Sequence, residues 1–317
     1  MSLVLPLLML GNAQARYPER PVALVVPYAA GGPMDKLARQ IGAHLQALLG
    51  QSVVVMNQGG AGGNIGAAAV KRAAPDGYTL LIDHVHMATA PALYRKLDFN
   101  PALDFEALGV VAESPLVLIS RPEIATGGVA DLQRWMAKQP QVTLANAGMG
   151  SASHLCGLLL QSALKRQMTT IPYRGTGPAM LDLLSGQVDL MCDLTANAMP
   201  QIQAHKVSAL AVTVRQPLKG TALETTPSME KFGIALDELT VWYGLYAPKG
   251  TPAEVTEKIS AALSAVVNGT AYRQQLFDAG IEPVTDERSS AAGHQRFLLK
   301  EIQRWAPVIK ASGDYAD

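Results

Sequence analysis

The chain has 317 residues, of which 26 are Lys or Arg and 26 are Asp or Glu, so its formal net charge is zero. A chain of this length exceeds one ordinary hydrophobic core, and we therefore expect two domains. The balanced charge offers no cationic field, which argues against nucleic acid and against anionic membrane surfaces as partners.

The N-terminal segment is apolar from Ser2 to Gly11, and the small-x-small sequence Ala13-Gln14-Ala15 follows it. An apolar run before such a sequence is typical of a secretory signal peptide, although no Lys or Arg precedes this run. The run is shorter than the roughly 20 apolar residues that span a bilayer. We expect residues 1–15 to be removed and the mature protein to be exported and soluble.

The first predicted strand, residues 22–26, leads through a glycine-containing loop, residues 27–35, into a helix that ends at Gly50. A continuous apolar run favours a strand buried on both faces, as in a parallel sheet. Gly31 and Gly32 leave backbone amides uncovered where the helix begins, and a helix N-terminus can hold an anion. We expect a side chain introduced at Gly31 to block the approach of such a ligand.

Strands and helices alternate along most of the remaining chain, which predicts an α/β fold with mostly parallel sheets. The other predicted strands are residues 53–56, 78–83, 107–112, 116–120, 142–145, 169–173, 188–192, 208–214 and 242–248. Predicted helices include residues 129–139, 155–165, 179–184, 195–204, 252–268, 270–279 and 289–311. The unit from Arg121 to Val214 looks inserted, because the C-terminal helices need a sheet to cover.

A second glycine loop, residues 146–154, also joins a predicted strand to a helix. Gly148 and Gly150 expose the backbone there, while Ser151 and Ser153 add hydroxyl groups. A serine at a helix start is also an ordinary N-cap. Two such loops, one in each domain, favour a cleft in which opposed helix ends hold one anion.

Two enzymatic alternatives are weaker. A serine hydrolase would use Ser151 or Ser153 with His154, but the G-x-S-x-G elbow is absent. A dinucleotide site in the loop of residues 59–66 fails because Ile65 occupies the position of the third required glycine. We expect no cofactor.

Other side chains are candidates for contacts with a ligand. His84 and His86 alternate in an extended segment, so both imidazoles are expected on one side, as donors to a bound acid. They would also make a metal pair, but no third ligand is near, and we expect no metal. Arg174 is a candidate cation for a carboxylate, and Asp193 follows a strand end, where open α/β sheets place ligands. Cys156 and Cys192 are expected to be free and buried, because the sequence does not place them within bonding distance.

Five motifs occur in an order that resembles the periplasmic substrate-binding proteins of tripartite tricarboxylate transporters, also called the Bug family. They are the segments of residues 27–35, 57–81, 147–154, 172–191 and 242–252, and together they cover essentially the whole mature chain. The family's small Gly/Thr/Ser loop after the third strand is replaced here by Asp83-His84-Val85-His86-Met87.

The resemblance implies a type II periplasmic-binding-protein fold, in which two domains close on a ligand by hinge motion. Domain 1 would comprise residues 16–121 and 240–317, and domain 2 residues 122–239. The protein would be a non-enzymatic monomer that delivers a di-, tri- or aromatic carboxylate to a membrane permease. The implied ligand-binding residues are Tyr28, Ala30, Gly31, Gly32, His84, His86, Gly148, Gly150, Ser151, Ser153, Tyr173, Arg174 and Asp193.

Overall fold

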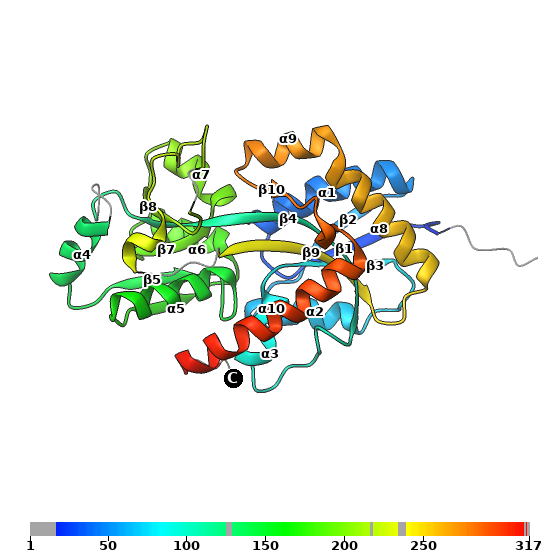
Figure 1. Ribbon diagram of the computed structural model, residues 1–317, viewed down its shortest axis with the longest axis horizontal. Coiled ribbons are helices and arrows are strands. Elements are labelled where there is room, and N and C mark those ends of the chain that lie inside the picture. The colour runs from blue at the N-terminus through cyan, green and yellow to red at the C-terminus, as the bar shows by residue number, and fades with distance from the viewer. Residues whose placement is uncertain (1–16, 125–128, 216–217, 234–238, 314, 316–317) are drawn as a thin grey trace, which may run out of the picture.

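The computed structural model describes residues 17–124, 129–215, 218–233, 239–313 and 315, and it divides into two α/β halves lying side by side (Figure 1). The predicted signal peptide, residues 1–15, lies outside these ranges. We call the halves the terminal half, built from both ends of the chain, and the middle half, built from the residues between β4 (Phe105–Ser120) and β9 (Thr240–Pro248). The predicted α/β class is confirmed.

The terminal half contains a sheet with helices on its faces (Figure 1). Its further strands are β1 (Val22–Val26), β2 (Val53–Asn57), β3 (Thr79–Asp83) and β10 (Glu282–Pro283). Its helices are α1 (Pro33–Leu49), α2 (Asn64–Lys71), α3 (His86–Leu93), α8 (Ala253–Asn268), α9 (Thr270–Asp278) and α10 (Ala291–Ser312), with short 3-10 helices at Ala61–Gly63 and Glu287–Ser289. β1 pairs in parallel with β2 and β3, and β3 pairs antiparallel with β9.

The middle half repeats this architecture with different elements. Its strands are β5 (Thr143–Asn146), β6 (Thr169–Pro172), β7 (Leu190–Leu194) and β8 (Ser208–Val212). Its helices are α4 (Val129–Ala137), α5 (Ala152–Leu164), α6 (Thr176–Leu184) and α7 (Thr195–Gln203), with a 3-10 helix at Met229–Phe232. β5 pairs in parallel with β6 and β7, so the parallel pairing predicted for this unit is also confirmed.

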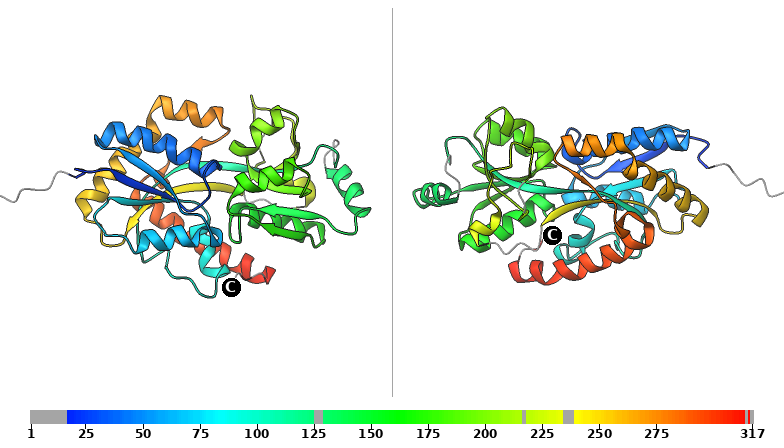
Figure 2. Two further views of the ribbon diagram at one scale, coloured as in Figure 1. Left: turned by 180° about the vertical axis from the view of Figure 1, so that it is seen from behind. Right: turned by 45° about the horizontal axis from the view of Figure 1, so that its top comes forward.

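Two long strands join the halves, and both views in Figure 2 show them running from one half into the other. β4 and β9 pair antiparallel, from Phe105 opposite Pro248 to Pro115 opposite Thr240. From Leu116 onward β4 pairs with β7 and β8 instead. Two separate strands were predicted in this region, which is wrong: Pro115, which has no N–H to donate, lies where the ladder changes partner and does not end the strand.

The predicted helix after β1 is confirmed, and its packing shows why it forms. Leu37, Ile41 and Leu45 recur at helical spacing and are fully buried against the terminal sheet. Gly50 ends the helix in the left-handed conformation, with φ of 73°. Across the described ranges, no helix combines the length and the apolar character needed to cross a lipid bilayer.

Candidate functional site

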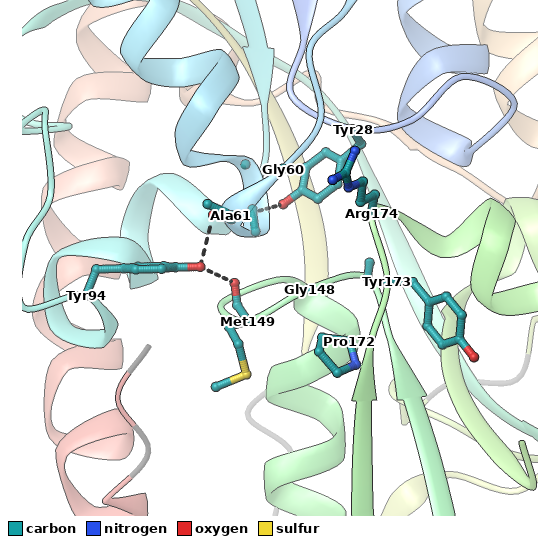
Figure 3. A pocket seen from close by; sticks show the side chains of 12 residues that line it. Tyr28, Gly60, Ala61, Tyr94, Gly148, Met149, Pro172, Tyr173 and Arg174 are labelled. Carbon is teal, nitrogen blue, oxygen red and sulfur yellow. Dashed lines mark hydrogen bonds between the residues drawn. The ribbon is translucent and has the colours of Figure 1, made fainter. Parts of the chain in front are cut away.

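A cleft of about 280 Å³ lies between the two halves, and Figure 3 shows its walls. We call it the outer cleft. It is lined by Tyr28, Gly60, Ala61, Gly62, Gly63 and Tyr94 from the terminal half, and by Ala147, Gly148, Met149, Pro172, Tyr173 and Arg174 from the middle half.

A smaller cavity of about 30 Å³ shares Tyr28 and Ala147 with the outer cleft, and we call it the inner pocket. It is lined by Tyr28, Ala29, Gly32, Pro33, Met34, Asp35, His84, Ala147, Gly175, Thr176 and Leu194. The first residues of α1 and of α6 are therefore both at this cavity, one helix from each half. The first-turn N–H groups of a helix have no intrahelical acceptor and carry a partial positive charge, so the inner pocket is suited to an anion.

The loop between β1 and α1 is held in place by its own hydrogen bonds. The backbone N–H of Gly31 donates to Asp35 Oδ2 at 3.0 Å, and Arg39 forms an ion pair with the same carboxylate. Burial alone would raise the pKa of Asp35, but these bonds to Arg39 and Gly31 hold it below its usual value. The Gly31 amide is thus already used. A Cβ at Gly31 would meet nothing within 4 Å, so the structure does not support the expected blocking by a side chain at this position.

The loop between β5 and α5 is likewise internally bonded. The N–H of Gly148 donates to Asn146 Oδ1 at 2.8 Å, and that of Gly150 donates to His154 Nδ1 at 3.3 Å. Gly148 has φ of 108°, and a Cβ there would lie 3.2 Å from Gly62 Cα of the other half. Gly148 and Gly150 therefore allow the two halves to approach closely, because a Cβ at either position would meet atoms of the terminal half.

The serines of this loop have structural partners. Ser151 Oγ caps α5 by accepting from the N–H of His154 at 3.2 Å. Ser151 is thus an ordinary N-cap, one of the two alternatives given for it from the sequence. Ser153 Oγ donates to the carbonyl of Cys192 at 2.6 Å. Both side chains are buried. Neither contact is one that would activate a serine nucleophile, so the geometry does not favour the hydrolase alternative.

The N-terminus of α6 was missed as a partner of α1. Its N-cap, Gly175, has φ of 133°, and a Cβ there would lie 3.4 Å from the nitrogen of Ala29. The same approach lets the N–H of Ala29 donate to the carbonyl of Arg174 at 3.1 Å. The signal was present in Gly175-Thr176-Gly177-Pro178, in which glycine precedes a helix with proline in its first turn.

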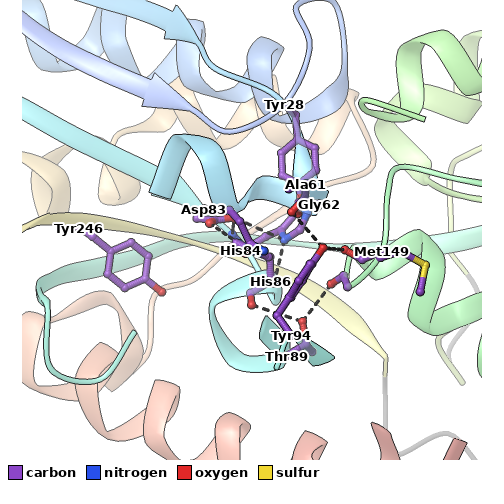
Figure 4. A network of polar contacts seen from close by, with 12 residues as sticks. Tyr28, Ala61, Gly62, Asp83, His84, His86, Thr89, Tyr94, Met149 and Tyr246 are labelled. Atoms are coloured by element: carbon purple, nitrogen blue, oxygen red, sulfur yellow. Dashed lines mark hydrogen bonds and ion pairs between the residues drawn. The ribbon is translucent and has the colours of Figure 1, made fainter. Parts of the chain in front are cut away.

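Two side chains of the terminal half also bond across the cleft, as Figure 4 shows. Thr89 Oγ1 donates to the carbonyl of Gly150 at 2.9 Å, and the hydroxyl of Tyr94 lies 2.9 Å from the carbonyl oxygen of Met149. Together with the bond from Ala29 to Arg174, these contacts hold the halves together along the cleft.

His86 and His84 do not share one side of an extended segment, because α3 begins at His86, so that prediction is wrong. His86 is fully buried, with Nδ1 at 2.7 Å from Asp83 Oδ2 and Nε2 at 2.8 Å from Asn64 Oδ1. Both ring nitrogens are occupied and His86 lines neither cavity, so its position does not support a contact with the ligand.

His84 does line the inner pocket, where its ring lies between Tyr28 and Tyr243 at centroid distances of 5.0 and 6.3 Å. Its Nδ1 accepts from the backbone N–H of His86 at 3.1 Å. Burial lowers the pKa of His84 to about 4, so the ring is neutral at pH 7. A neutral ring that accepts at Nδ1 carries its proton on Nε2.

The remaining predicted residues have different surroundings. Ala30 is exposed in the β1–α1 loop, beside Gly32 at the inner pocket. Tyr173 lines the outer cleft with its backbone, but its hydroxyl donates to Asp182 Oδ2 at 2.6 Å, away from the cleft (Figure 3). Arg174 lines the same cleft, and its guanidinium has no ion-pair partner in the described ranges.

Asp193 is fully buried at the end of β7, where its carboxylate accepts from the N–H of Leu194 at 2.8 Å and from the amide of Asn197. Burial raises the pKa of Asp193 to about 7, although the contacts with Asn197, Leu194 and Thr176 act in the opposite direction. Its neighbour Leu194 lines the inner pocket, so the carboxyl group lies just behind that cavity.

The expectation of two free cysteines is wrong, since Cys156 and Cys192 form a disulfide with their Cα atoms 6.1 Å apart. Spacing along the chain carries no information on this distance. α5 packs against β7, and that packing brings the two sulfur atoms together. The bridge ties α5, the helix that follows the β5–α5 loop, to β7, the strand that contains Asp193.

Comparison with known proteins identifies the family. Residues 37–313 match the model of the tripartite tricarboxylate transporter family receptor. The chain belongs to this family. The receptor is similar to the solved structure of the periplasmic binding protein BugD, with 41% sequence identity, a TM-score of 0.91, and coverage of 95% of this chain and 100% of that one.

Two further structures similar to this receptor were determined with a ligand. MatC from Rhodopseudomonas palustris, with bound malate, is 34% identical at a TM-score of 0.87, with 92% of this chain and 100% of that one covered. Rpa4515 from R. palustris, with adipate, is 32% identical at a TM-score of 0.87, with 94% of this chain and 98% of that one covered. Family and neighbours are binding proteins, which gives the hydrolase alternative no support.

Proposed function

We propose that this chain is a periplasmic receptor that binds a small organic carboxylate between its two halves and delivers it to the permease of a tripartite tricarboxylate-type transporter. The observation that carries the proposal is the position of the α1 and α6 N-termini, which come from opposite halves and flank one small cavity. The carboxylates bound by two relatives, malate and adipate, support the same ligand class.

The receptor would work by hinge closure without catalysis. We take domain 1 as residues 16–121 with 240–317 and domain 2 as residues 122–239, so that β4 and β9 form the hinge. A ligand drives closure only to the extent that it binds the closed state better than the open one. An anion held by amides of both domains meets that condition, because opening removes half of its partners. We take the mature protein to be monomeric, with residues 1–15 removed on export.

A thermal-shift screen tests the ligand class. Purified receptor is mixed with mono-, di- and tricarboxylates, including aromatic acids, and with sugars and metal cations as controls. A ligand at about 100 times its dissociation constant should stabilise the protein by about 2.7 kcal/mol. A shift with a sugar or a cation but with none of the carboxylates would refute the proposal.

Turnover separates receptor from hydrolase. We expect a panel of chromogenic esters to give no product above the rate of the Ser151→Ala and Ser153→Ala variants. Ester hydrolysis that either substitution abolishes would favour the enzymatic alternative.

A further inference from the structure

Two side chains at the inner pocket, His84 and Thr176, offer polar atoms to a ligand, and they come from opposite halves. Thr176 Oγ1 is buried beside the Asp193 carboxylate and has no hydrogen bond of normal geometry in the described part of the chain. His84 is a buried residue that lines the same pocket, its Nδ1 accepts from the N–H of His86, and the proton on its Nε2 is available to a ligand. Buried polar groups are almost always well paired, so the Thr176 hydroxyl points to a group that a ligand supplies, and His84 offers a donor at the same pocket.

The two atoms define the kind of group that fits. His84 Nε2–H is a donor, whereas the Thr176 hydroxyl both donates and accepts. A hydroxyl oxygen can accept from His84 and donate to Thr176, and a carbonyl oxygen can accept from both. An ammonium group has no lone pair for His84, and a methylene group satisfies neither atom.

The position and size of the inner pocket place this group on the ligand. The pocket holds about 30 Å³, room for one or two water-sized groups. A Cβ at Gly32, the N-cap of α1, would lie 3.8 Å from Thr176 Oγ1, so Thr176 faces the start of that helix. The inner pocket therefore accepts one substituent oxygen of the ligand, beside a carboxylate at the helix ends, and the remainder of the ligand extends into the outer cleft.

We propose that His84 and Thr176 are specificity-determining residues that select carboxylates with a hydroxyl or oxo group on the carbon next to the bound carboxyl. This inference rests on the proposed function, because it requires that the helix ends hold a carboxylate. A ligand without the oxygen leaves the Thr176 hydroxyl buried without a well-placed partner and gives the His84 N–H no acceptor. A site built to bond a substrate hydroxyl discriminates strongly against the analogue that lacks it.

Isothermal titration calorimetry with matched acid pairs tests the inference. The pairs are lactate with propionate and malate with succinate, each differing by one hydroxyl. We expect the wild-type receptor to prefer the hydroxy acid of at least one pair by about 10- to 100-fold, the usual effect of leaving buried polar groups unpaired. Thr176→Val and His84→Ala should each reduce this ratio mainly by weakening the hydroxy acid, and His84→Gln, which keeps an N–H donor, should restore part of it.

Thr89→Val is the matched control, because Thr89 bonds Gly150 across the cleft and lies outside the inner pocket. It should weaken both acids of a pair equally and leave their ratio unchanged. Equal wild-type affinities within both pairs, or a full preference retained by Thr176→Val, would overturn the inference while leaving the carboxylate function intact. If no carboxylate binds, the inference falls together with the proposed function.

Discussion

The hydroxyl of Tyr94 lies between two carbonyl oxygens, 2.9 Å from that of Met149 in the middle half and 3.0 Å from that of Ala61 in the terminal half. It thereby connects the two walls of the outer cleft. We therefore expect it to stabilise the contact between the two halves irrespective of which acid is bound.

Tyr94→Phe removes this contact and keeps the ring. We expect the affinity for every bound acid to fall by one common factor of roughly 2- to 10-fold, the usual contribution of one hydrogen bond. Titration calorimetry with several acids measures the factor. Tyr17→Phe is the control, since the Tyr17 hydroxyl donates to Gly77 within the terminal half. A loss confined to one acid would show that the hydroxyl contacts that ligand instead.

Gly62→Ala should prevent the halves from closing. A Cβ at Gly62 would lie 1.9 Å from the carbonyl oxygen of Met149 across the cleft. We expect ligand binding to weaken by more than in Tyr94→Phe, while the free energy of unfolding falls by about 1 kcal/mol because of the positive φ. Gly50→Ala is the control, since Gly50 has φ of +73° but no atom within 4 Å of the added Cβ. Equal binding by the two variants would exclude steric obstruction.

Buried histidines should make stability depend on pH. Burial lowers the pKa of His294 to about 3, and its value in the unfolded chain is about 6.5. Between about pH 3 and pH 6.5 the unfolded state therefore binds more protons than the folded state. The contribution of His294 to stability is complete above about pH 6.5 and is lost as the pH falls toward 3. His84 acts in the same direction, whereas Asp193, with its raised pKa, acts in the opposite one.

The contribution of His294 is isolated by comparison with His294→Gln. We expect urea unfolding between pH 4.5 and 7.5 to give a free energy of unfolding that falls less steeply with decreasing pH in the variant than in the wild type. His44→Gln is the control, because His44 bonds Gln275 at an exposed site. A wild-type slope in His294→Gln would show that this ring is not held neutral.

Removing the disulfide should lower stability without unfolding the receptor. Cys156 and Cys192 are 36 positions apart, and a closed loop of this size contributes roughly 3–4 kcal/mol in the chain-entropy account. We expect the double variant C156S/C192S to lose up to that amount in urea unfolding. A reductant should destabilise the wild type and leave the variant unchanged. Two reactive thiols in unfolded protein kept free of reductant would contradict the bridge.

Local patterns in the sequence predicted much of the fold correctly. The apolar run of β1 and the recurrence of Leu37, Ile41 and Leu45 at every fourth position are short-range signals, and both elements form as expected. The strand β4 was predicted as two strands, residues 107–112 and 116–120, but Pro115 between them does not end it. Whether proline ends a strand depends on the partner opposite it, and that partner, Thr240, is more than a hundred residues away.

The site was predicted less completely, for the same reason. Glycines before helices identified loops able to bind an anion, yet their amides could not be assigned without knowing that Asp35 and His154 accept from them. The choice of α6 as the helix opposite α1 depends on how the halves face each other. The disulfide depends on how α5 packs on β7. Relations of this kind arise only in the folded chain.

The place of β9 in the sheet has a consequence for the order in which the polypeptide matures. β9 lies between β3 and β4, although 119 residues separate the end of β4 from its first residue, Thr240. The terminal half therefore stays incomplete until the last quarter of the chain has been synthesised, whereas the strands and helices from α4 to β8 are contiguous and available earlier. Domains generally fold as units and in the order in which they are synthesised. The middle half should therefore gain its structure before the terminal half does.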